Sequence, residues 1–289
     1  MADGKPETPG ADSAGPGAGN ELVRRIASAL ALIPAVLALL WLGGWPFTAL
    51  LAAAGFILAR EWAQLVYGTP GRPVAWGTGL ATLLGLFLLE AVSPLAGAAA
   101  ALAIMAALGV WTALKGDGPG RILGGFVYIV LPLLALAWLR QAEEGFLLVL
   151  WLVLIVWATD TGAYAAGRLI GGPKLAPRFS PNKTWAGLVG GALSAALVGA
   201  LTAGWLLGQG VWQLAALSAV LAVISQAGDI VESVLKRRAG VKDSGTLIPG
   251  HGGLLDRVDG LIFACLAASL LALIFQATGL PVSRVILWP

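Results

Sequence analysis

The densest group of side chains that could do chemistry runs from Gly228 to Arg238, directly after an apolar stretch. If this segment is helical, Asp229 shares one face with Lys236 and with either Glu232 or Ser233, because the intervals are three, four and seven residues. That face would present a carboxylate, a hydroxyl and an ammonium group together. A carboxylate beside an apolar span is costly, so we expect Asp229 to be paired or functional.

A second group follows between Lys242 and Gly260. It contains a glycine-rich turn around His251, whose backbone N–H groups could approach an anion closely. Asp256 and Asp259 come one helical turn apart at the start of the last apolar run, where capping of a helix could explain one of them. Two carboxylates facing Asp229 across a helical hairpin are typical of oxygen ligands for Mg²⁺ with bound phosphates. The predicted metal ligands are therefore Asp229, Asp256 and Asp259.

A third group lies between Asp160 and Trp185. Asp160 ends an apolar run and could be a metal ligand, a base or a partner for a neighbouring helix. The basic residues Lys174, Arg178 and Lys183 could clamp a polyphosphate or could anchor the chain at a membrane surface. The pair Lys183-Thr184 resembles the end of a P-loop, but the upstream glycines are missing, so a P-loop NTPase is excluded.

The composition shows what must position these groups. Of the 289 residues, 58% are hydrophobic and only 11% are charged, whereas about a quarter of the residues in soluble domains are charged. The chain has one cysteine, Cys265, and one histidine, His251, so an internal disulfide, a thiolate cluster and a zinc site of paired histidines are excluded. We expect an all-α, polytopic integral membrane protein in which any bound metal has oxygen ligands.

Apolar runs long enough to span a bilayer recur along the chain and predict about nine transmembrane helices. The predicted spans are Ile26 to Leu42, Pro46 to Ala59, Val74 to Val92, Leu95 to Leu114, Ile122 to Leu139, Phe146 to Ala158, Ala186 to Leu207, Val211 to Ala227 and Val258 to Thr278. Residues 1–20 are predicted to be a disordered tail rather than a signal peptide. Residues 21–289 are predicted to form a single transmembrane domain.

The basic residues predict the orientation, because short cytosolic loops retain Lys and Arg. With a cytosolic N-terminus, all 18 Lys and Arg residues except Arg140 and Arg284 fall on the cytosolic side. The two longest predicted inner loops run from Asp160 to Trp185 and from Gly228 to Arg257, and they contain the three groups described above. We therefore expect the chemistry to take place at the cytosolic face.

The ordered motifs in these loops resemble the signature of the phosphatidate cytidylyltransferases, also called CDP-diacylglycerol synthases. The resemblance rests on the upstream segments Asp160-x-x-Ala163-Tyr164, Ser180-Pro181-Asn182-Lys183-Thr184-Trp185 and Gly228-Asp229-x-x-Glu232, and on the run Ser233-x-x-Lys236-Arg237-x4-Lys242-Asp243-x5-Pro249-x-His251-Gly252-Gly253-x-x-Asp256-Arg257-x-Asp259. These motifs cover roughly the C-terminal half, and the N-terminal half shares only its multispan character. One departure is Ala186, where the family usually has a glutamate, so any role for a carboxylate at that position is in doubt.

The resemblance implies that CTP and phosphatidate react to give CDP-diacylglycerol and diphosphate in phospholipid biosynthesis. It places the catalytic half at about residues 157–278 in the inner, or plasma, membrane. It implies Mg²⁺ on Asp229, Asp256 and Asp259, and leaves open a second cation. It gives catalytic roles to Lys236, Ser233 and Asp256, and it places around the substrates Ser180, Asn182, Lys183, Thr184, Arg237, His251 and Arg257. The implied partners are the two substrates and membrane lipid, with no nucleic acid, and a homodimer is left open.

Two other classes of membrane protein fit the sequence less well. A CDP-alcohol phosphotransferase would begin with the pair Asp259-Gly260, but the Ala-Arg pair and the later aspartates of that pattern are missing. A cation-coupled transporter would place charged residues near the middle of interrupted spans. In this chain the charged residues cluster in the predicted inner loops, which favours the enzyme.

Overall fold

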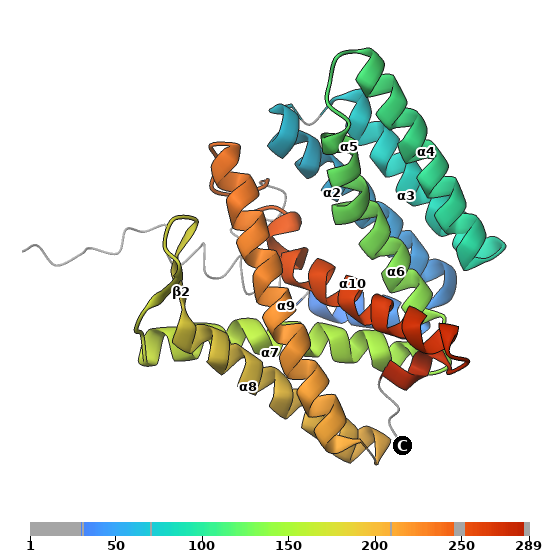
Figure 1. Ribbon diagram of the computed structural model, residues 1–289. Coiled ribbons are helices and arrows are strands. Elements are labelled where there is room, and N and C mark those ends of the chain that lie inside the picture. The colour runs from blue at the N-terminus through green and yellow to red at the C-terminus, as the bar shows by residue number, and fades with distance from the viewer. Residues whose placement is uncertain (1–29, 31, 70, 209, 246–251, 286–289) are drawn as a thin grey trace, which may run out of the picture.

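Helices form nearly all of the described chain (Figure 1). A computed structural model describes residues 30, 32–69, 71–208, 210–245 and 252–285. The predicted tail at 1–20, the first part of the predicted first span and His251 lie outside these residues. The only sheet in the described part is a two-stranded hairpin. The predicted all-α, polytopic architecture is confirmed.

Within the described part of the chain, eight helices are long and apolar enough to cross a membrane. They are α2 (Gly44–Tyr67), α3 (Pro73–Ala91), α4 (Pro94–Leu114), the continuous helix Gly120–Arg140, α7 (Gly145–Leu169), the continuous helix Trp185–Leu207, α9 (Val211–Arg238) and α10 (Leu255–Ala277). The helix Gly120–Arg140 consists of α5 (Gly120–Gly125), a π-helical turn (Phe126–Val130) and α6 (Leu131–Arg140), and Trp185–Leu207 consists of α8 (Trp185–Thr202) and a π-helical turn (Ala203–Leu207). A shorter apolar helix, Leu32–Leu42, lies within the first predicted span, and a short 3₁₀ helix (Val282–Val285) follows α10.

Local sequence explains several helix ends. Proline occupies the first turn of α3 and α4, where its missing N–H group has no partner to lose. Ser93 precedes α4, and its side chain accepts a hydrogen bond from the Ala96 backbone N–H at 3.2 Å. Gly68 follows α2 in the left-handed conformation that glycine adopts most readily.

Two helices run well past their predicted spans. α7 continues to Leu169 and α9 continues to Arg238, whereas apolar character ends near Ala158 and Ala227. The prediction of one long loop from Asp160 to Trp185 was therefore wrong in its first third. Apolar composition marks the part of a helix that lipid surrounds, and a helix can continue into the aqueous layer without it.

The rest of that predicted loop forms a hairpin of β1 (Lys174–Ala176) and β2 (Ser180–Thr184). The strands are antiparallel, with Lys174 opposite Thr184 and Ala176 opposite Ser180. β2 leads directly into α8, because Thr184 is also the N-cap of that helix and accepts a hydrogen bond from the Gly187 backbone N–H at 3.0 Å. The hairpin is therefore held at the same end of the bundle as the start of α8.

The helices form two groups with α10 between them (Figure 1). α2, α3 and α4 pack in sequence and contact α6, while α7, α8 and α9 pack together as a second group. α10 contacts α6 from the first group and both α7 and α9 from the second. The first turns of α10 therefore lie where residues from both halves of the chain can meet.

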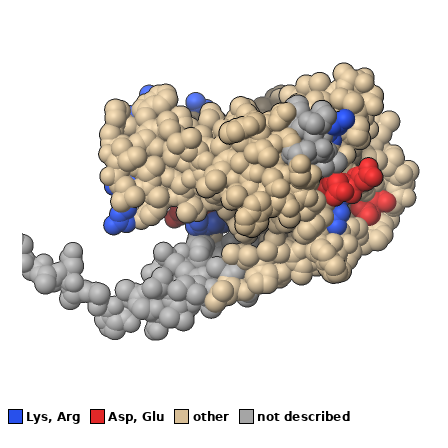
Figure 2. Space-filling view, turned by 90° about the horizontal axis from the view of Figure 1, so that it is seen from below, with Lys and Arg blue, Asp and Glu red and all other residues tan. Residues whose placement is uncertain are grey.

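Uncharged residues cover most of the face seen in Figure 2, and the charged side chains lie in a few groups near its edges. Large apolar side chains on the helices are also widely exposed, such as Leu95, Leu193 and Trp205. Such a surface suits contact with lipid rather than with water. Cys265 is buried, as expected for a packed thiol within an apolar run.

Candidate active site

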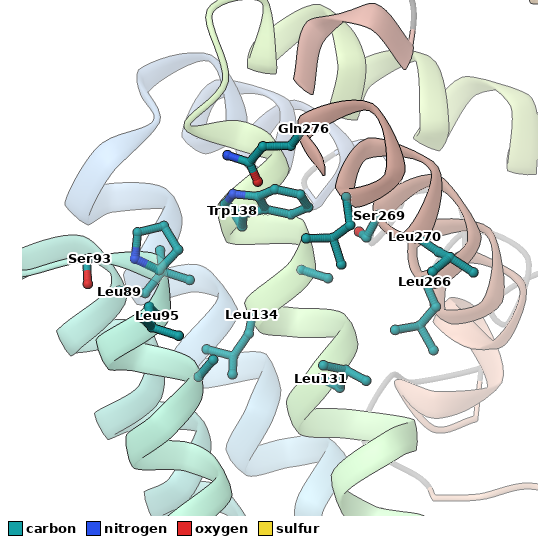
Figure 3. A pocket seen from close by; sticks show the side chains of 14 residues that line it. Leu89, Ser93, Leu95, Leu131, Leu134, Trp138, Leu266, Ser269, Leu270 and Gln276 are labelled. Carbon is teal, nitrogen blue, oxygen red and sulfur yellow. The ribbon is translucent and has the colours of Figure 1, made fainter. Parts of the chain in front are cut away.

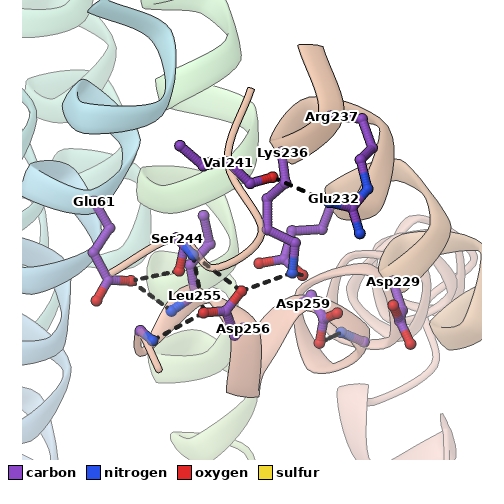
Figure 4. A network of polar contacts seen from close by, with 12 residues as sticks. Glu61, Asp229, Glu232, Lys236, Arg237, Val241, Ser244, Leu255, Asp256 and Asp259 are labelled. Atoms are coloured by element: carbon purple, nitrogen blue, oxygen red, sulfur yellow. Dashed lines mark hydrogen bonds and ion pairs between the residues drawn. The ribbon is translucent and has the colours of Figure 1, made fainter. Parts of the chain in front are cut away.

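Three carboxylates from two helices converge at one end of the bundle (Figure 4). Asp229 and Glu232 come from α9 and Asp259 comes from α10, and one carboxylate oxygen of each lies within 4.8 Å of the other two. Glu232 is 1% exposed, and its Oε1 has no hydrogen-bond partner among the described residues. A buried carboxylate oxygen without a donor is costly unless a cation, a water molecule or a proton shared with a neighbouring carboxylate meets it. We call these three residues the acidic cluster.

The geometry of α9 brings its part of the cluster together. Because the helix continues to Arg238, Asp229, Glu232 and Lys236 recur every three or four residues and share one face. The condition that this segment is helical therefore holds, and the prediction of one long loop from Gly228 to Arg257 was wrong as far as Arg238. Gly228 allows α9 to approach α10 here, since an added Cβ would lie 2.9 Å from the Asp259 carbonyl oxygen and close to the Phe263 ring.

Lys236 joins the two helices at the edge of the cluster. Its Nζ donates to Glu232 Oε2 at 3.1 Å and to Asp256 Oδ1 at 2.7 Å, and its side chain is 15% exposed. Ion pairs with this little exposure are screened far less by solvent than pairs on an open surface. The ammonium group therefore fixes the position of Glu232 on α9 relative to Asp256 on α10.

Asp256 lies apart from the acidic cluster, although it was predicted to be a metal ligand. Besides Lys236, its two oxygens accept from the backbone N–H of Gly253 at 2.9 Å and from that of Ser244 at 3.0 and 3.2 Å. The contact with Gly253, three residues earlier, ties the segment before α10 to the first turn of that helix. The oxygens of Asp256 are thus held by Lys236 and by the segment before α10, and Glu232 is the third carboxylate that the structure brings to Asp229 and Asp259.

The hairpin delivers a second lysine to the cluster. Lys183 on β2 pairs with Asp229 Oδ2 at 2.5 Å and donates to the Gln226 carbonyl oxygen at 3.3 Å. Asp160, exposed on α7, lies within electrostatic range of Asp229, Lys183 and Arg257. Three elements beyond α9 therefore contribute charge around Asp229.

The other predicted substrate-binding residues are more scattered. Thr184 is 3% exposed and caps α8, so its hydroxyl is committed to the backbone. Asn182 is exposed and Ser180 is half-buried on β2, while Ser233 is half-buried on α9. Arg237 is exposed and donates to the Val241 carbonyl oxygen at 3.4 Å.

Glu61 on α2 reaches the same region and was given no role from sequence. Its carboxylate is 7% exposed and accepts from the backbone N–H groups of Leu254 at 2.8 Å and Leu255 at 2.7 Å, and from Ser244 Oγ at 3.3 Å. One signal for it was present: Glu61 follows a predicted apolar span, and a carboxylate in such a place is costly unless it is paired.

The charges of the site do not balance by themselves. With all four carboxylates ionised, Asp229, Glu232, Asp256 and Asp259 outnumber the two lysine ammonium groups by two charges, and the nearby Asp160 and Arg257 add one charge of each sign. One divalent cation would neutralise this excess. Carboxylate oxygens at this spacing are also the ligand type that Mg²⁺ prefers.

Comparison with known proteins agrees with the arrangement of the site. A model of the cytidylyltransferase family matches residues 23–275. A phosphatidate cytidylyltransferase of Brucella suis is 39% identical over 270 residues, which cover 91% of this chain and 97% of the relative. The corresponding protein of Brucella abortus is 40% identical over 264 residues, covering 89% and 95%, and one from Staphylococcus epidermidis is 49% identical over 122 residues, covering 42% and 47%.

The similarity to the family extends beyond the C-terminal half, which contains the motifs that first indicated it. A match over residues 23–275 includes α2 to α6, and with them Glu61. The chain belongs to the cytidylyltransferase family.

Proposed function

We propose that this protein is a phosphatidate cytidylyltransferase that transfers a cytidylyl group from CTP to phosphatidate. The observation that carries the proposal is the acidic cluster, flanked by two lysines at one end of a membrane-spanning bundle. Family membership supports the nucleotide, and the names of the relatives support the lipid acceptor. An amphipathic acceptor also suits a site at the end of lipid-facing helices.

The acidic cluster fits a magnesium ion, which we propose as the cofactor. Glu232 Oε1 is buried without a donor, all three candidate ligands offer oxygen, and the surrounding charges leave an excess of two. The proposed ligands are Asp229, Glu232 and Asp259. Bound there, Mg²⁺ would neutralise charge on the nucleotide phosphates and on the departing diphosphate.

The proposed reaction needs no strong base. A phosphate oxygen of phosphatidate attacks the α-phosphorus of CTP and forms a new P–O–P linkage. The bond between the α-phosphorus and the oxygen that bridges it to the β-phosphorus breaks, and diphosphate leaves. A phosphate monoester is already anionic near neutral pH, so no side chain has to remove a proton from it. Positioning and charge neutralisation therefore supply the catalysis.

The basic residues around the cluster have separable proposed roles. Lys183 can move its ammonium group from Asp229 to a nucleotide phosphate once a cation shares that carboxylate. Lys236 has three N–H donors, and two of them go to Glu232 and Asp256, so its third donor can contact a phosphate oxygen while it holds the two helices. Arg257 and Arg237 are proposed to lie near the triphosphate or the lipid headgroup.

The site is proposed to face the cytosol, where CTP is found. Basic residues predict that orientation by the positive-inside rule, with the N-terminus inside. The proposed location is the plasma membrane, where phosphatidate can reach the site by diffusing within the bilayer.

Separately labelled nucleotides test the proposed reaction. Purified protein in phosphatidate-containing micelles should transfer label from [α-³²P]CTP into lipid, while label from [γ-³²P]CTP should appear in diphosphate. Transfer of the γ-label to lipid would mean a kinase reaction, and transfer of neither label would remove the proposed function.

A further inference from the structure

The carboxylate of Glu61 comes from the N-terminal half of the chain and ends against the start of α10. Oε1 accepts from the Leu254 N–H and Oε2 from the Leu255 N–H, at 2.8 and 2.7 Å. The first N–H groups of a helix have no acceptor within the helix, and the helix dipole makes this end positive. Glu61 therefore caps α10 from a different helix.

This carboxylate packs closely against two glycines, which leave no room for a larger residue. A Cβ added at Gly253 would lie 2.9 Å from Glu61 Oε1, and one added at Gly245 would lie 2.8 Å from the same atom. Glu61 itself is 7% exposed. Because little water reaches the carboxylate, the N–H groups that it accepts from would lose their partner without replacement if the carboxylate were removed.

A continuous set of hydrogen bonds connects Glu61 with the acidic cluster (Figure 4). Ser244 donates through Oγ to Glu61 and through its backbone N–H to Asp256. Asp256 accepts from Lys236, and Lys236 also donates to Glu232. The connection runs from α2 through the segment before α10 to Glu232 on α9.

We infer that Glu61 is a positioning residue for the acidic cluster. By fixing the first turn of α10, it keeps Asp259 within reach of Asp229 and Glu232. The inference rests on the proposed function in one respect, that the acidic cluster binds a divalent cation. If Glu61 merely stabilised the fold, its substitution would lower the melting temperature without a selective change in cation affinity.

Glu61→Gln tests this role, because glutamine keeps the size and one acceptor oxygen but turns an NH₂ group toward one of the two backbone N–H groups. We expect hydrogen–deuterium exchange to accelerate at Leu254 and Leu255. We also expect the affinity for Mn²⁺, measured by electron paramagnetic resonance on the purified protein, to fall about tenfold, as for the loss of one hydrogen bond to a charged group.

Glu90→Gln is the matched control. Glu90 lies on α3, where its Oε2 accepts from Thr48 at 3.2 Å and from Gln141 at 3.1 Å. It is a partly buried carboxylate that joins three helical segments, like Glu61, but at the other end of α2. Its substitution should leave the Mn²⁺ affinity unchanged.

Two results would overturn the inference: an unchanged Mn²⁺ affinity in Glu61→Gln, or equal weakening in Glu61→Gln and Glu90→Gln. If Glu61→Gln does not fold, Ser244→Ala provides the test, because it removes the Oγ contact and keeps the backbone N–H that Asp256 accepts. It should weaken Mn²⁺ binding severalfold, and unchanged affinity would again overturn the inference. A wild-type protein that binds Mn²⁺ but does not use CTP would contradict only the proposed reaction. A wild-type protein that does not bind Mn²⁺ would remove the metal site and this inference with it.

Discussion

Glu232→Gln is the substitution that best separates the two candidate third ligands of the acidic cluster. Glu232 is 1% exposed, accepts from Lys236 through Oε2 and has no hydrogen-bond partner among the described residues at Oε1. Glutamine keeps the shape but removes the negative charge. A hydrogen bond to a charged group contributes about 1.5–3 kcal/mol, and the lost charge also weakens the attraction for a cation.

From these contributions we expect the catalytic efficiency of Glu232→Gln at limiting Mg²⁺ to fall by about 100-fold, which corresponds to about 2.7 kcal/mol. The assay is conversion of radiolabelled CTP to lipid product across a Mg²⁺ titration. Excess Mg²⁺ should recover part of the activity, because the remaining carboxylates of Asp229 and Asp259 can still attract the ion.

Asp256→Asn is the comparison within the same network. Both Asp256 oxygens accept from Lys236 or from backbone N–H groups, so the amide would turn an NH₂ group toward a donor. We expect this variant to melt at a lower temperature and to raise the Mg²⁺ concentration for half-maximal activity severalfold through the loosened network, which is less than the increase expected for Glu232→Gln. A shifted Mg²⁺ requirement in Asp256→Asn together with an unchanged one in Glu232→Gln would refute the reasoning and restore Asp256 as the ligand.

Two further predictions concern single contacts, and a third concerns the orientation of the chain in the membrane. Lys236→Arg should lower turnover at least about tenfold without loss of folded protein, because a planar guanidinium cannot replace the compact ammonium between two carboxylates. The exposed control Arg238→Lys should have no effect on turnover. Equal, small effects of the two substitutions would mean that Lys236 is a membrane anchor. Thr184→Val should lower the stability by about 1 kcal/mol through loss of the N-cap of α8, measured by thermal unfolding, and an unchanged melting temperature would contradict the capping role. In a variant without the native cysteine, Glu143→Cys should react with an impermeant thiol reagent from outside intact cells and Gly118→Cys should not; the reverse pattern would invert the proposed orientation.

The apolar cavity in Figure 3 is separate from the proposed chemistry. It has a volume of about 710 Å³ and lies among α4, α6 and α10, with Leu134, Trp138 and Leu270 in its lining. Leu266 and Gln276, which also line it, lie two to five turns along α10 from the acidic residues at its start. The size of a cavity therefore does not mark the proposed site in this protein, since the proposed chemistry depends on charged groups at the helix ends.

Much of the membrane architecture could be predicted from sequence, because lipid imposes a length and a composition on every spanning helix. The eight long apolar helices correspond to eight of the nine predicted spans. The helical ends beyond Ala158 and Ala227 could not be placed in this way, since polar residues outside the bilayer carry no such constraint. The β1–β2 hairpin was missed because its strands are three and five residues long and lack an alternating apolar pattern.

The candidate site was predictable in part. Spacing placed Asp229 and Lys236 on one face with either Glu232 or Ser233 if the segment was helical, and the structure shows that helix. Spacing could not decide between Asp256 and Glu232, because the choice depends on which donors the segment before α10 presents. Glu61 was missed because its partners lie more than 180 residues away, and only the packing of α2 against that segment brings them together.

Formation of CDP-diacylglycerol by the Asp259→Asn variant tests the central claim most directly. Asp259 belongs to the acidic cluster, and its Oδ1 accepts from the Gly260 N–H at 2.8 Å, a contact that asparagine can keep through its own oxygen. The purified variant should fold and should form no labelled lipid from [α-³²P]CTP and phosphatidate at a Mg²⁺ concentration that saturates the wild type. Near wild-type turnover at limiting Mg²⁺ would contradict the assignment of a catalytic metal site between α9 and α10.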